Sequence, residues 1–193
     1  MKYIKLFESM TEIEVEKICK KYKIENWTLN PDGTVDVDGD VYLSAQRLSK
    51  LPLKFGRVTG NFFCHYNQLT SLEGCPTEID GDFWCHSNKL TSLEGCPTEI
   101  GGYFWCSYNQ LTSLKGAPEY IEGKLDFMPN NNLPEYIKQI VDLNYDDKDI
   151  QKYILKWQKE YDIWRRDGSF NQDRFILMME DAGDELKNLK LPE

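Results

Sequence analysis

The sequence contains no long apolar run. No stretch approaches the roughly 18 consecutive apolar residues that mark a membrane-spanning helix. Residues 1–8 hold too short an apolar run for a secretory signal peptide, and no small-residue cleavage pattern follows them. We therefore expect a soluble, cytoplasmic protein whose partner is not a membrane.

The sequence also has fewer basic than acidic residues. The chain has 23 Lys and Arg residues against 32 Asp and Glu residues, which gives a formal net charge of −9. No segment gathers its lysines and arginines into a basic patch, and binding to a nucleic-acid backbone depends on such a patch. The sequence therefore argues against nucleic acid as a partner, and against an anionic membrane surface for the same reason.

Residue types that carry catalysis or bind metals are few. His65 and His86 are the only histidines, and none of the 6 cysteines belongs to a C-x-x-C pair of the kind that binds zinc. No serine or cysteine has an obvious base partner at its spacing. We expect no enzyme activity, no metal and no cofactor, with the cysteines as small core residues in a reducing cytosol. A pH-sensitive or metal-binding histidine pair stays open as an alternative.

What the sequence does contain is an internal repeat. Three blocks align without gaps at a period of 21 residues, namely Gly60–Pro76, Gly81–Pro97 and Gly102–Pro118. Weaker copies at residues 39–51 and 123–130 flank these blocks, which makes about five repeats. Atypical outer copies are what a solenoid needs at its two ends.

Each block has the spacing apolar-x-apolar-x-x-Asn-x-Leu-x-x-Leu. This pattern resembles the leucine-rich-repeat signature over residues 37–133, with Cys or Phe in place of some leucines. The resemblance implies stacked coils with a parallel sheet on the concave side. Its asparagines would form an internal ladder of Asn67, Asn88, Asn109 and Asn130. A glycine column before the strands departs from the signature, and glycine there would allow a positive φ angle; it holds Gly39, Gly60, Gly81, Gly102 and Gly123.

The N-terminal end of the repeat has different signals. Residues 11–22 read as a helix that Thr11 can cap, and the turn at residues 30–33 predicts a hairpin that leads into the first repeat. Together they would cover the first open edge of the solenoid. Residues 36–40 superficially resemble a calcium loop but lack its full spacing, so calcium is kept only as an alternative.

From Pro134 the apolar period becomes helical, with helices expected at 134–142, 147–166 and 171–188. The sequence therefore predicts an α/β solenoid of leucine-rich repeats with period 21, a parallel sheet on its concave face and a helical cap at each end. The expected parts are a helix and hairpin cap, a solenoid and a C-terminal helical subdomain, over residues 1–37, 38–133 and 134–193. A second recognition or dimerisation surface on the C-terminal helices is an alternative.

Strand alternation decides which side chains of the repeat face outwards. Two columns are uniformly apolar, whereas the column between them ends in Asp126 and is therefore assigned to the outside. Stacked strands lie about 4.8 Å apart, so this outward column would be a ladder about 15 Å long. It holds Tyr42, Phe63, Trp84 and Trp105. Neighbouring columns add the remaining predicted binding residues, which are His65, His86, Tyr66, Tyr103, Tyr108 and Asp82.

Large exposed apolar patches usually mark binding sites, and Tyr and Trp dominate interface energies. We therefore predict a non-catalytic protein that recognises another protein through this aromatic concave face. Short proteins rich in the string LTSLEGCP are similar to ones encoded by large bacteriophages and some bacteria, and that resemblance suggests an origin rather than a function. If the origin is a phage, a host or defence protein inhibited by this binding is the expected target. Alternatives are a sponge for a nucleotide or glycan, a homodimer that covers the ladder, and cross-strand packing alone.

Overall fold

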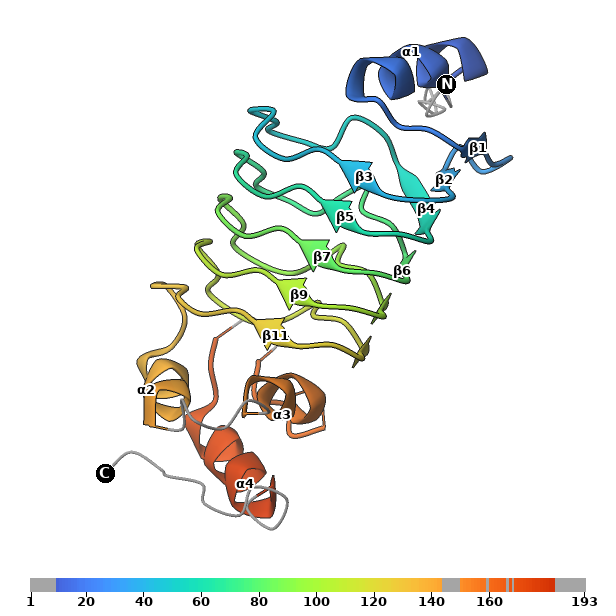
Figure 1. Cartoon of the computed structure of the whole chain (residues 1–193). Coiled ribbons are helices and arrows are strands. Elements are labelled where there is room, and N and C mark those ends of the chain that lie inside the picture. The colour runs from blue at the N-terminus through green and yellow to red at the C-terminus, as the bar shows by residue number, and fades with distance from the viewer. Residues whose placement is uncertain (1–9, 144–149, 159, 166, 168, 183–193) are drawn as a thin grey trace, which may run out of the picture.

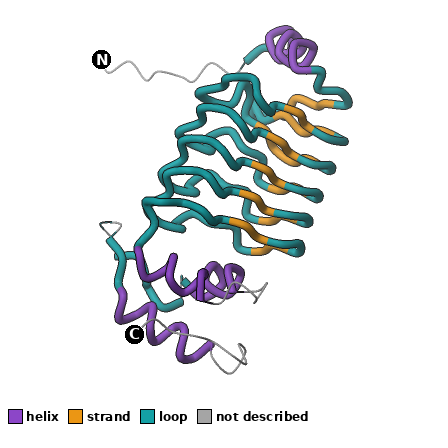
Figure 2. Tube along the Cα trace, turned by 60° about the vertical axis from the view of Figure 1, so that its left-hand side comes forward, coloured by secondary structure: helices purple, strands orange, loops and turns teal. Residues whose placement is uncertain are grey.

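The structure, a computed structural model of the chain, describes residues 10–143, 150–158, 160–165, 167 and 169–182 (Figure 1). These residues form a β-solenoid of stacked parallel coils, with one helix at the N-terminal end and a group of helices at the C-terminal end. Successive coils contribute short strands to two sheets, which run along the stack (Figure 2).

The first sheet has five strands in the order β11-β9-β7-β5-β3, and we call it the β3–β11 sheet. Its strands are β3 (Val41–Tyr42), β5 (Phe62–Phe63), β7 (Phe83–Trp84), β9 (Phe104–Trp105) and β11 (Leu125–Asp126). The second sheet has six strands in the order β1-β2-β4-β6-β8-β10, and we call it the β1–β10 sheet. Its strands are β1 (Trp27–Leu29), β2 (Val35–Val37), β4 (Phe55–Val58), β6 (Glu78–Ile79), β8 (Glu99–Ile100) and β10 (Tyr120–Ile121).

The register of the β3–β11 sheet confirms the period of 21 residues. Successive strands are parallel, and the paired positions are Val41, Phe62, Phe83, Phe104 and Leu125. Each position is one repeat after the last, so one repeat makes one coil. The parallel part of the β1–β10 sheet was not among the expectations.

The interior of the coils is apolar, as the column assignment predicts. Phe83 and Phe104 are fully buried, and their rings stack with centroids 5.4 Å apart. Cys64, Cys85 and Cys106 form a second buried column, and their thiols are free. Burial raises the pKa of the Cys85 thiol well above its usual value, so this thiol stays uncharged and serves as a packing group.

The predicted asparagine ladder is present inside the stack. The Asn88 amide donates to the carbonyls of Cys64 and Cys85 at 3.1 and 3.0 Å, and its oxygen accepts the N–H of Leu69 at 2.9 Å. One side chain therefore satisfies backbone groups of two adjacent coils that would otherwise be buried and unpaired. Asn67, Asn109 and Asn130 make equivalent bonds.

The glycine column is required for a different reason from the one expected. Within it only Gly39 has a positive φ angle, at 131°. The other glycines lie where the backbones of successive coils leave no room for a Cβ atom. The N–H of Gly81 donates to the carbonyl of Gly60 at 3.1 Å, and a Cβ on Gly81 would lie 2.8 Å from that same oxygen. A side chain there would force the coils apart, so the expectation of a positive φ holds only at the first copy.

The helix and the hairpin expected in the N-terminal cap are both present, and residues 1–9 of the expected cap lie outside the described part. Helix α1 (Glu12–Tyr22) begins after Thr11, whose backbone N–H donates to the Glu14 carboxylate at 2.8 Å. Strands β1 and β2 form the expected antiparallel hairpin, and β2 continues into the β1–β10 sheet by pairing with β4. The acidic residues at 36–40 act as acceptors for the next coil, with bonds from Arg57 N–H to Asp36, from the Thr59 hydroxyl to Asp38 and from Asn61 N–H to Asp40.

At the C-terminal end lie α2 (Glu135–Leu143), α3 (Ile150–Trp157) and α4 (Gln172–Ala182). The expected helices at 134–142 and 171–188 correspond to α2 and α4, although residues 183–193 lie outside the described part. The expected helix at 147–166 is wrong in its length, because α3 ends at Trp157. Residues 144–149 also lie outside the described part. None of the described helices has the length and apolar character needed to cross a membrane.

Gln158 gives the physical reason for the early end of α3. Its side chain is buried, donates to the carbonyl of Leu114 at 3.0 Å and accepts the indole N–H of Trp164 at 2.7 Å. The chain then turns back, because the N–H of Ile163 donates to the carbonyl of Gln158 and Trp164 pairs with Phe170 in an antiparallel bridge. These contacts, one with the coil that contains Leu114 and the others within residues 158–170, outweigh the helical periodicity of the segment.

Candidate functional site

The outward column of the β3–β11 sheet forms one continuous row of rings. Ring centroids lie 5.4 Å apart between Tyr42 and Phe63, 4.7 Å between Phe63 and Trp84, and 5.5 Å between Trp84 and Trp105. The strand register places these rings one coil apart, since Tyr42, Phe63, Trp84 and Trp105 are successive partners. Tyr42 is exposed, and the other three are half-buried because they cover one another.

A second row runs beside the first and contains both histidines. The rings of His65 and His86 stack with centroids 4.7 Å apart and an interplanar angle of 16°. His86 also stacks on Trp105 at 4.1 Å, which links the two rows. Tyr66 contacts His86 edge-on at 5.0 Å. His86 therefore contacts both Trp105 of the first row and Tyr66, so the ring of Tyr66 packs against rings that are already held in place.

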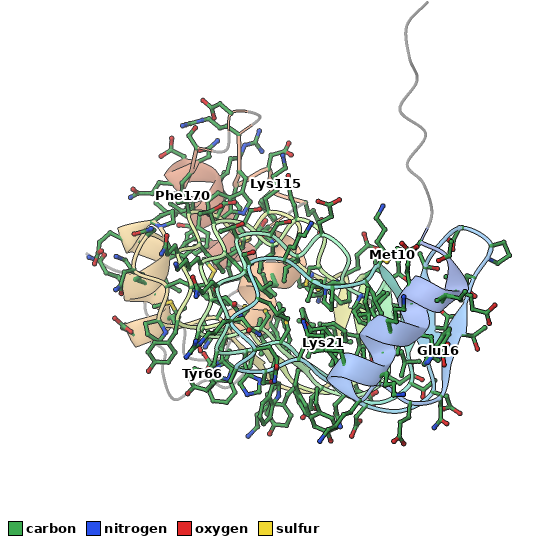
Figure 3. All side chains as sticks on the ribbon, turned by 90° about the horizontal axis from the view of Figure 1, so that it is seen from above. Met10, Glu16, Lys21, Tyr66, Lys115 and Phe170 are labelled. Carbon is green, nitrogen blue, oxygen red and sulfur yellow. The ribbon has the colours of Figure 1, made fainter. Side chains whose placement is uncertain are left out.

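Tyr66 and Tyr108 are the most exposed predicted residues of this surface, at 63% and 61%. They share a left-handed backbone conformation with Ser87, which lies between them in the same column. The repeat therefore directs the two tyrosines outwards in equivalent positions. Figure 3 looks down on the stack and shows Tyr66 on the opposite side from Lys115.

Polar side chains border the first row and tie the coils together. Oδ1 of Asn61 accepts the N–H of Asp82, and Oδ1 of Asp82 accepts the N–H of Tyr103, both at 2.7 Å. Asp82 is therefore an inter-coil acceptor, a role that the sequence did not indicate. Tyr103 is 45% exposed, and the ammonium of Lys124 lies 5.6 Å from its ring centroid.

We call these predicted binding residues together the aromatic face. Its members are Tyr42, Phe63, His65, Tyr66, Asp82, Trp84, His86, Tyr103, Trp105 and Tyr108. They lie on the outer side of the β3–β11 sheet and its adjoining turns, although the rings around His86 leave it buried, at 4% exposure. Seven of them touch one another ring to ring, whereas Asp82 and Tyr103 lie on one border and Tyr108 stands apart.

Both histidines are neutral at neutral pH because of where they lie. Burial, and to a smaller extent the neighbouring His65, lower the pKa of His86 to about 4. Burial also lowers the pKa of His65. The Nδ1 atom of His65 lies 3.0 Å from the Ser44 hydroxyl, and Nδ1 of His86 lies 3.0 Å from the Ser87 hydroxyl. The face is therefore uncharged along its histidine row.

The geometry of the histidine pair does not suit a metal ion. Lone pairs lie in the plane of each imidazole, and a zinc–nitrogen bond is about 2.0–2.1 Å long. Rings that are nearly parallel with centroids 4.7 Å apart do not converge on one ion. Across the described ranges, no group of three or more His, Cys, Asp or Glu residues is arranged to hold a metal.

The indole of Trp84 carries a feature that packing alone does not explain. Its Nε1 atom is fully enclosed and has no hydrogen-bond partner among the described residues. An enclosed donor without an acceptor is costly. By contrast, the indole N–H of Trp105 donates to the hydroxyl of Ser107.

A second recess, which the sequence did not indicate, lies between β10 and α3. It has a volume of about 290 Å³ and is lined by residues 118–121 of the last coil and by Lys152, Tyr153, Leu155 and Lys156 of α3. The spacing of Lys152 and Lys156 places them on one face of a helix. Only the folded chain shows that this face meets the end of a sheet.

Comparison of the chain with protein-family models, with curated proteins and with solved structures found no match. The aromatic face and the recess are therefore interpreted from their own geometry, charge and exposure.

Proposed function

We propose that this chain is a non-catalytic binding protein that recognises a partner protein through the aromatic face. The observation that carries this proposal is a continuous row of rings on a rigid sheet, with Tyr66 and Tyr108 exposed beside it. Tyrosine and tryptophan combine a large apolar surface with a polar group, which is why they dominate protein interfaces. The stacked coils hold these rings in place before binding, so little side-chain entropy is lost on association.

The stability lost by enclosing the indole N–H of Trp84 without an acceptor also supports a binding role. A row optimised only for stability would not enclose an indole N–H without an acceptor. Residues that break such a rule often belong to functional surfaces. This cost favours a role for the ring row in addition to cross-strand packing.

A catalytic role has less support from the same residues. The Ser44 hydroxyl lies beside His65, which is the start of a nucleophile–base arrangement. In the part of the chain that is described, however, no carboxylate bonds to His65 to orient its ring, and burial lowers the pKa of this imidazole and makes it a weaker base. We therefore assign Ser44 and His65 to the binding surface.

The asparagine ladder supports the likeness to leucine-rich repeats, since Asn88 bonds the backbone of its own and the preceding coil. On that likeness we propose that the chain acts in the cytoplasm by occupying a surface of its partner. If the chain is phage-encoded, a host or defence protein inhibited by this binding is the corresponding target. The net charge of −9 favours a partner with basic residues around its contact surface.

The test uses the two most exposed tyrosines, because their loss leaves the interior intact. A Tyr66→Ala/Tyr108→Ala double variant should lose at least about tenfold in affinity for a partner captured by the wild-type chain. Ile13→Ala on α1 is the matched control, since Ile13 is 64% exposed and lies at the end of the stack. Affinity is measured by calorimetry with the purified partner. Equal affinity of the double variant and the control would refute recognition through the aromatic face.

A flat small molecule is the second candidate for the same surface. Exposed rings beside Asp40 and Asn61 could stack a sugar ring and bond its hydroxyls. A nucleotide is disfavoured because carboxylates, rather than clustered lysines, border the row. Calorimetric titration with glycans and nucleotides separates this candidate from a protein partner. A homodimer that covers the face would instead appear in sedimentation and would dissociate in the double tyrosine variant.

A further inference from the structure

The β1–β10 sheet ends at β10, whose far side is not paired with any strand in the described part of the chain. An open sheet edge exposes unpaired backbone donors and acceptors, and proteins usually cover it. At the other end of this sheet the hairpin of β1 and β2 provides such a cover. At the C-terminal end of the sheet, no strand of the described residues covers the edge of β10 in this way.

The hydrogen bonds of the preceding coil show which backbone groups of β10 point outwards. The carbonyl of Ile100 accepts the N–H of Glu122 at 3.0 Å, so Ile100 directs its backbone polar groups forward along the stack. In a parallel pair, one residue bonds the neighbouring strand through both its N–H and its carbonyl. Ile121 occupies the same position one coil later, and its N–H and carbonyl therefore point away from β8 towards α3.

Helix α3 and the residue after it close the rest of this end with side-chain hydrogen bonds. Oε1 of Gln151 accepts the N–H of Phe127 at 2.8 Å on the neighbouring sheet, and Nζ of Lys152 donates to the carbonyl of Glu122 at 3.1 Å. Gln158 closes a third point by donating to the carbonyl of Leu114 at 3.0 Å. Of these, the Gln151 bond takes the place of a next-coil bond, since the equivalent N–H of Cys106 donates to the carbonyl of Asp126. No such bond to Ile121 occurs within the described ranges.

The recess of about 290 Å³ lies where this closure is missing. One wall is the β10 edge from Pro118 to Ile121, and the other is a face of α3 that carries Lys152 and Lys156. Glu119 is the one acidic residue of the lining, so the recess is net positive in a chain whose net charge is −9. The ammonium of Lys152 bonds a neutral backbone carbonyl, which leaves its charge uncompensated by that contact.

We propose that this recess is a second binding site, in which an extended acidic segment of a partner polypeptide pairs with β10 as an added strand. The segment bonds the N–H and carbonyl of Ile121 through its backbone, in the mode known as strand addition. Its acidic side chain lies against Lys152 and Lys156, and an apolar side chain packs between Tyr120 and Tyr153. This site lies on a different sheet from the aromatic face and does not depend on the function proposed for that face.

The test is an NMR titration of the full chain with blocked pentapeptides. One peptide alternates valine with glutamate, and the matched peptide carries lysine in place of glutamate. The acidic peptide should shift the amide signal of Ile121 and slow its hydrogen exchange by at least about tenfold, because a new hydrogen bond protects it. The basic peptide should leave Ile121 unchanged.

Two variants make the test specific. Ile121→Pro removes the outward N–H but keeps the bonds from Tyr120 and Glu122 to β8, and proline is tolerated on an edge strand. Lys156→Glu reverses a charge of the recess, with Lys89→Glu on an exposed turn as its control. Ile121→Pro and Lys156→Glu should each weaken binding of the acidic peptide about tenfold, whereas Lys89→Glu should not. The proposal is overturned by acidic-peptide shifts that map to the aromatic face, by no shifts at millimolar peptide, or by unchanged affinity in a folded Ile121→Pro variant.

Discussion

At the scale of single residues, the buried polar side chains of the solenoid act mainly on backbone groups. Coils of 21 residues contain long irregular turns, and their carbonyls and N–H groups cannot all pair within a sheet. Asn88 and its equivalents satisfy these groups from inside. The asparagine column is thus as important to the stack as the apolar columns on either side of it.

We predict that Asn88→Ala lowers the free energy of unfolding by about 2–5 kcal/mol, because it leaves the carbonyls of Cys64 and Cys85 and the N–H of Leu69 buried and unpaired. Urea unfolding followed by circular dichroism measures the change. Gln110→Ala is the control, since Gln110 is exposed. A change no larger than that of the control would mean that water replaces the asparagine amide.

The lowered pKa of His86 makes stability depend on pH. The unfolded chain binds a proton near the ordinary histidine pKa of about 6.5, whereas the folded chain does so only near about 4. Stability is therefore complete above pH 6.5 and is lost as the pH falls towards 4. We predict a loss of about 1–3 kcal/mol across this window, with His65 contributing in the same direction.

Urea unfolding at several pH values between about 7 and 5, above the range in which most carboxylates titrate, checks this prediction. His86→Phe keeps an aromatic ring in the stack and removes the titrating group, so it should flatten the pH dependence. An NMR titration of His86 in the folded chain provides the direct value. A folded-state pKa at or above the ordinary histidine value would contradict the proposed burial effect.

At the scale of elements, α3 and the residue after it take the place of a further coil. Gln151 accepts the N–H of Phe127, which a next coil would have paired, and Lys152 and Gln158 donate to the carbonyls of Glu122 and Leu114. A solenoid end needs such a cover because every interior coil is paired on both sides. These three bonds lie at separate points of the end, and among the described residues none of them reaches Ile121 of β10.

Gln158→Leu keeps the volume of the side chain but removes its hydrogen bonds to Leu114 and Trp164. We expect it to destabilise the C-terminal cap by about 1–3 kcal/mol, since the half-buried indole N–H of Trp164 loses its acceptor and the carbonyl of Leu114 keeps only the N–H of Ala117. Hydrogen exchange resolved along the sequence should show faster exchange in α3 and around Leu114, with little effect on α1. Gln172→Ala at the exposed start of α4 is the control. Uniform acceleration along the chain would instead indicate one cooperative unit.

At the scale of the whole molecule, each coil contacts mainly its two neighbours. The residue pairing of both sheets runs from one coil to the next, with no strand inserted from elsewhere in the described part. Stability of such a stack is approximately a sum of coil and interface contributions. Because the three central blocks are nearly identical in sequence, the coil on either side of one block could pair with another block in its place.

We predict that deleting residues 81–101 gives a folded solenoid that is shorter by one coil. The deletion removes 21 of 193 residues in register, so the denaturant dependence of the unfolding free energy should fall by about a tenth. Deleting residues 81–90 instead breaks the register and should abolish cooperative unfolding. Equal behaviour of the two deletions would contradict the coil-by-coil architecture. The in-register deletion also removes Trp84 and His86, so it should weaken binding through the aromatic face.

Much of this architecture can be predicted from the sequence, because aligning the repeats allows each position to be compared with its equivalents in the other coils. The column that ends in Asp126 was assigned outwards by that comparison, and Tyr42, Phe63, Trp84 and Trp105 do face outwards. The position of the glycines was visible, but the reason for Gly81 was not, since coil-to-coil distance has no counterpart in local sequence. The length of α3 was missed because Gln158 bonds residues distant in sequence.

The sequence by itself determined the period, the inward and outward columns and the internal asparagines, because each of these is a local pattern repeated every 21 residues. Only the tertiary structure decided the ring contacts that join His86 to Trp105, the bonds that make Asp82 a link between coils, and the recess between β10 and α3. The physical reason is that the repeated sequence specifies the contacts between one coil and the next, which has an equivalent sequence. How the last coil meets three helices of different sequence depends on packing that occurs once in the molecule.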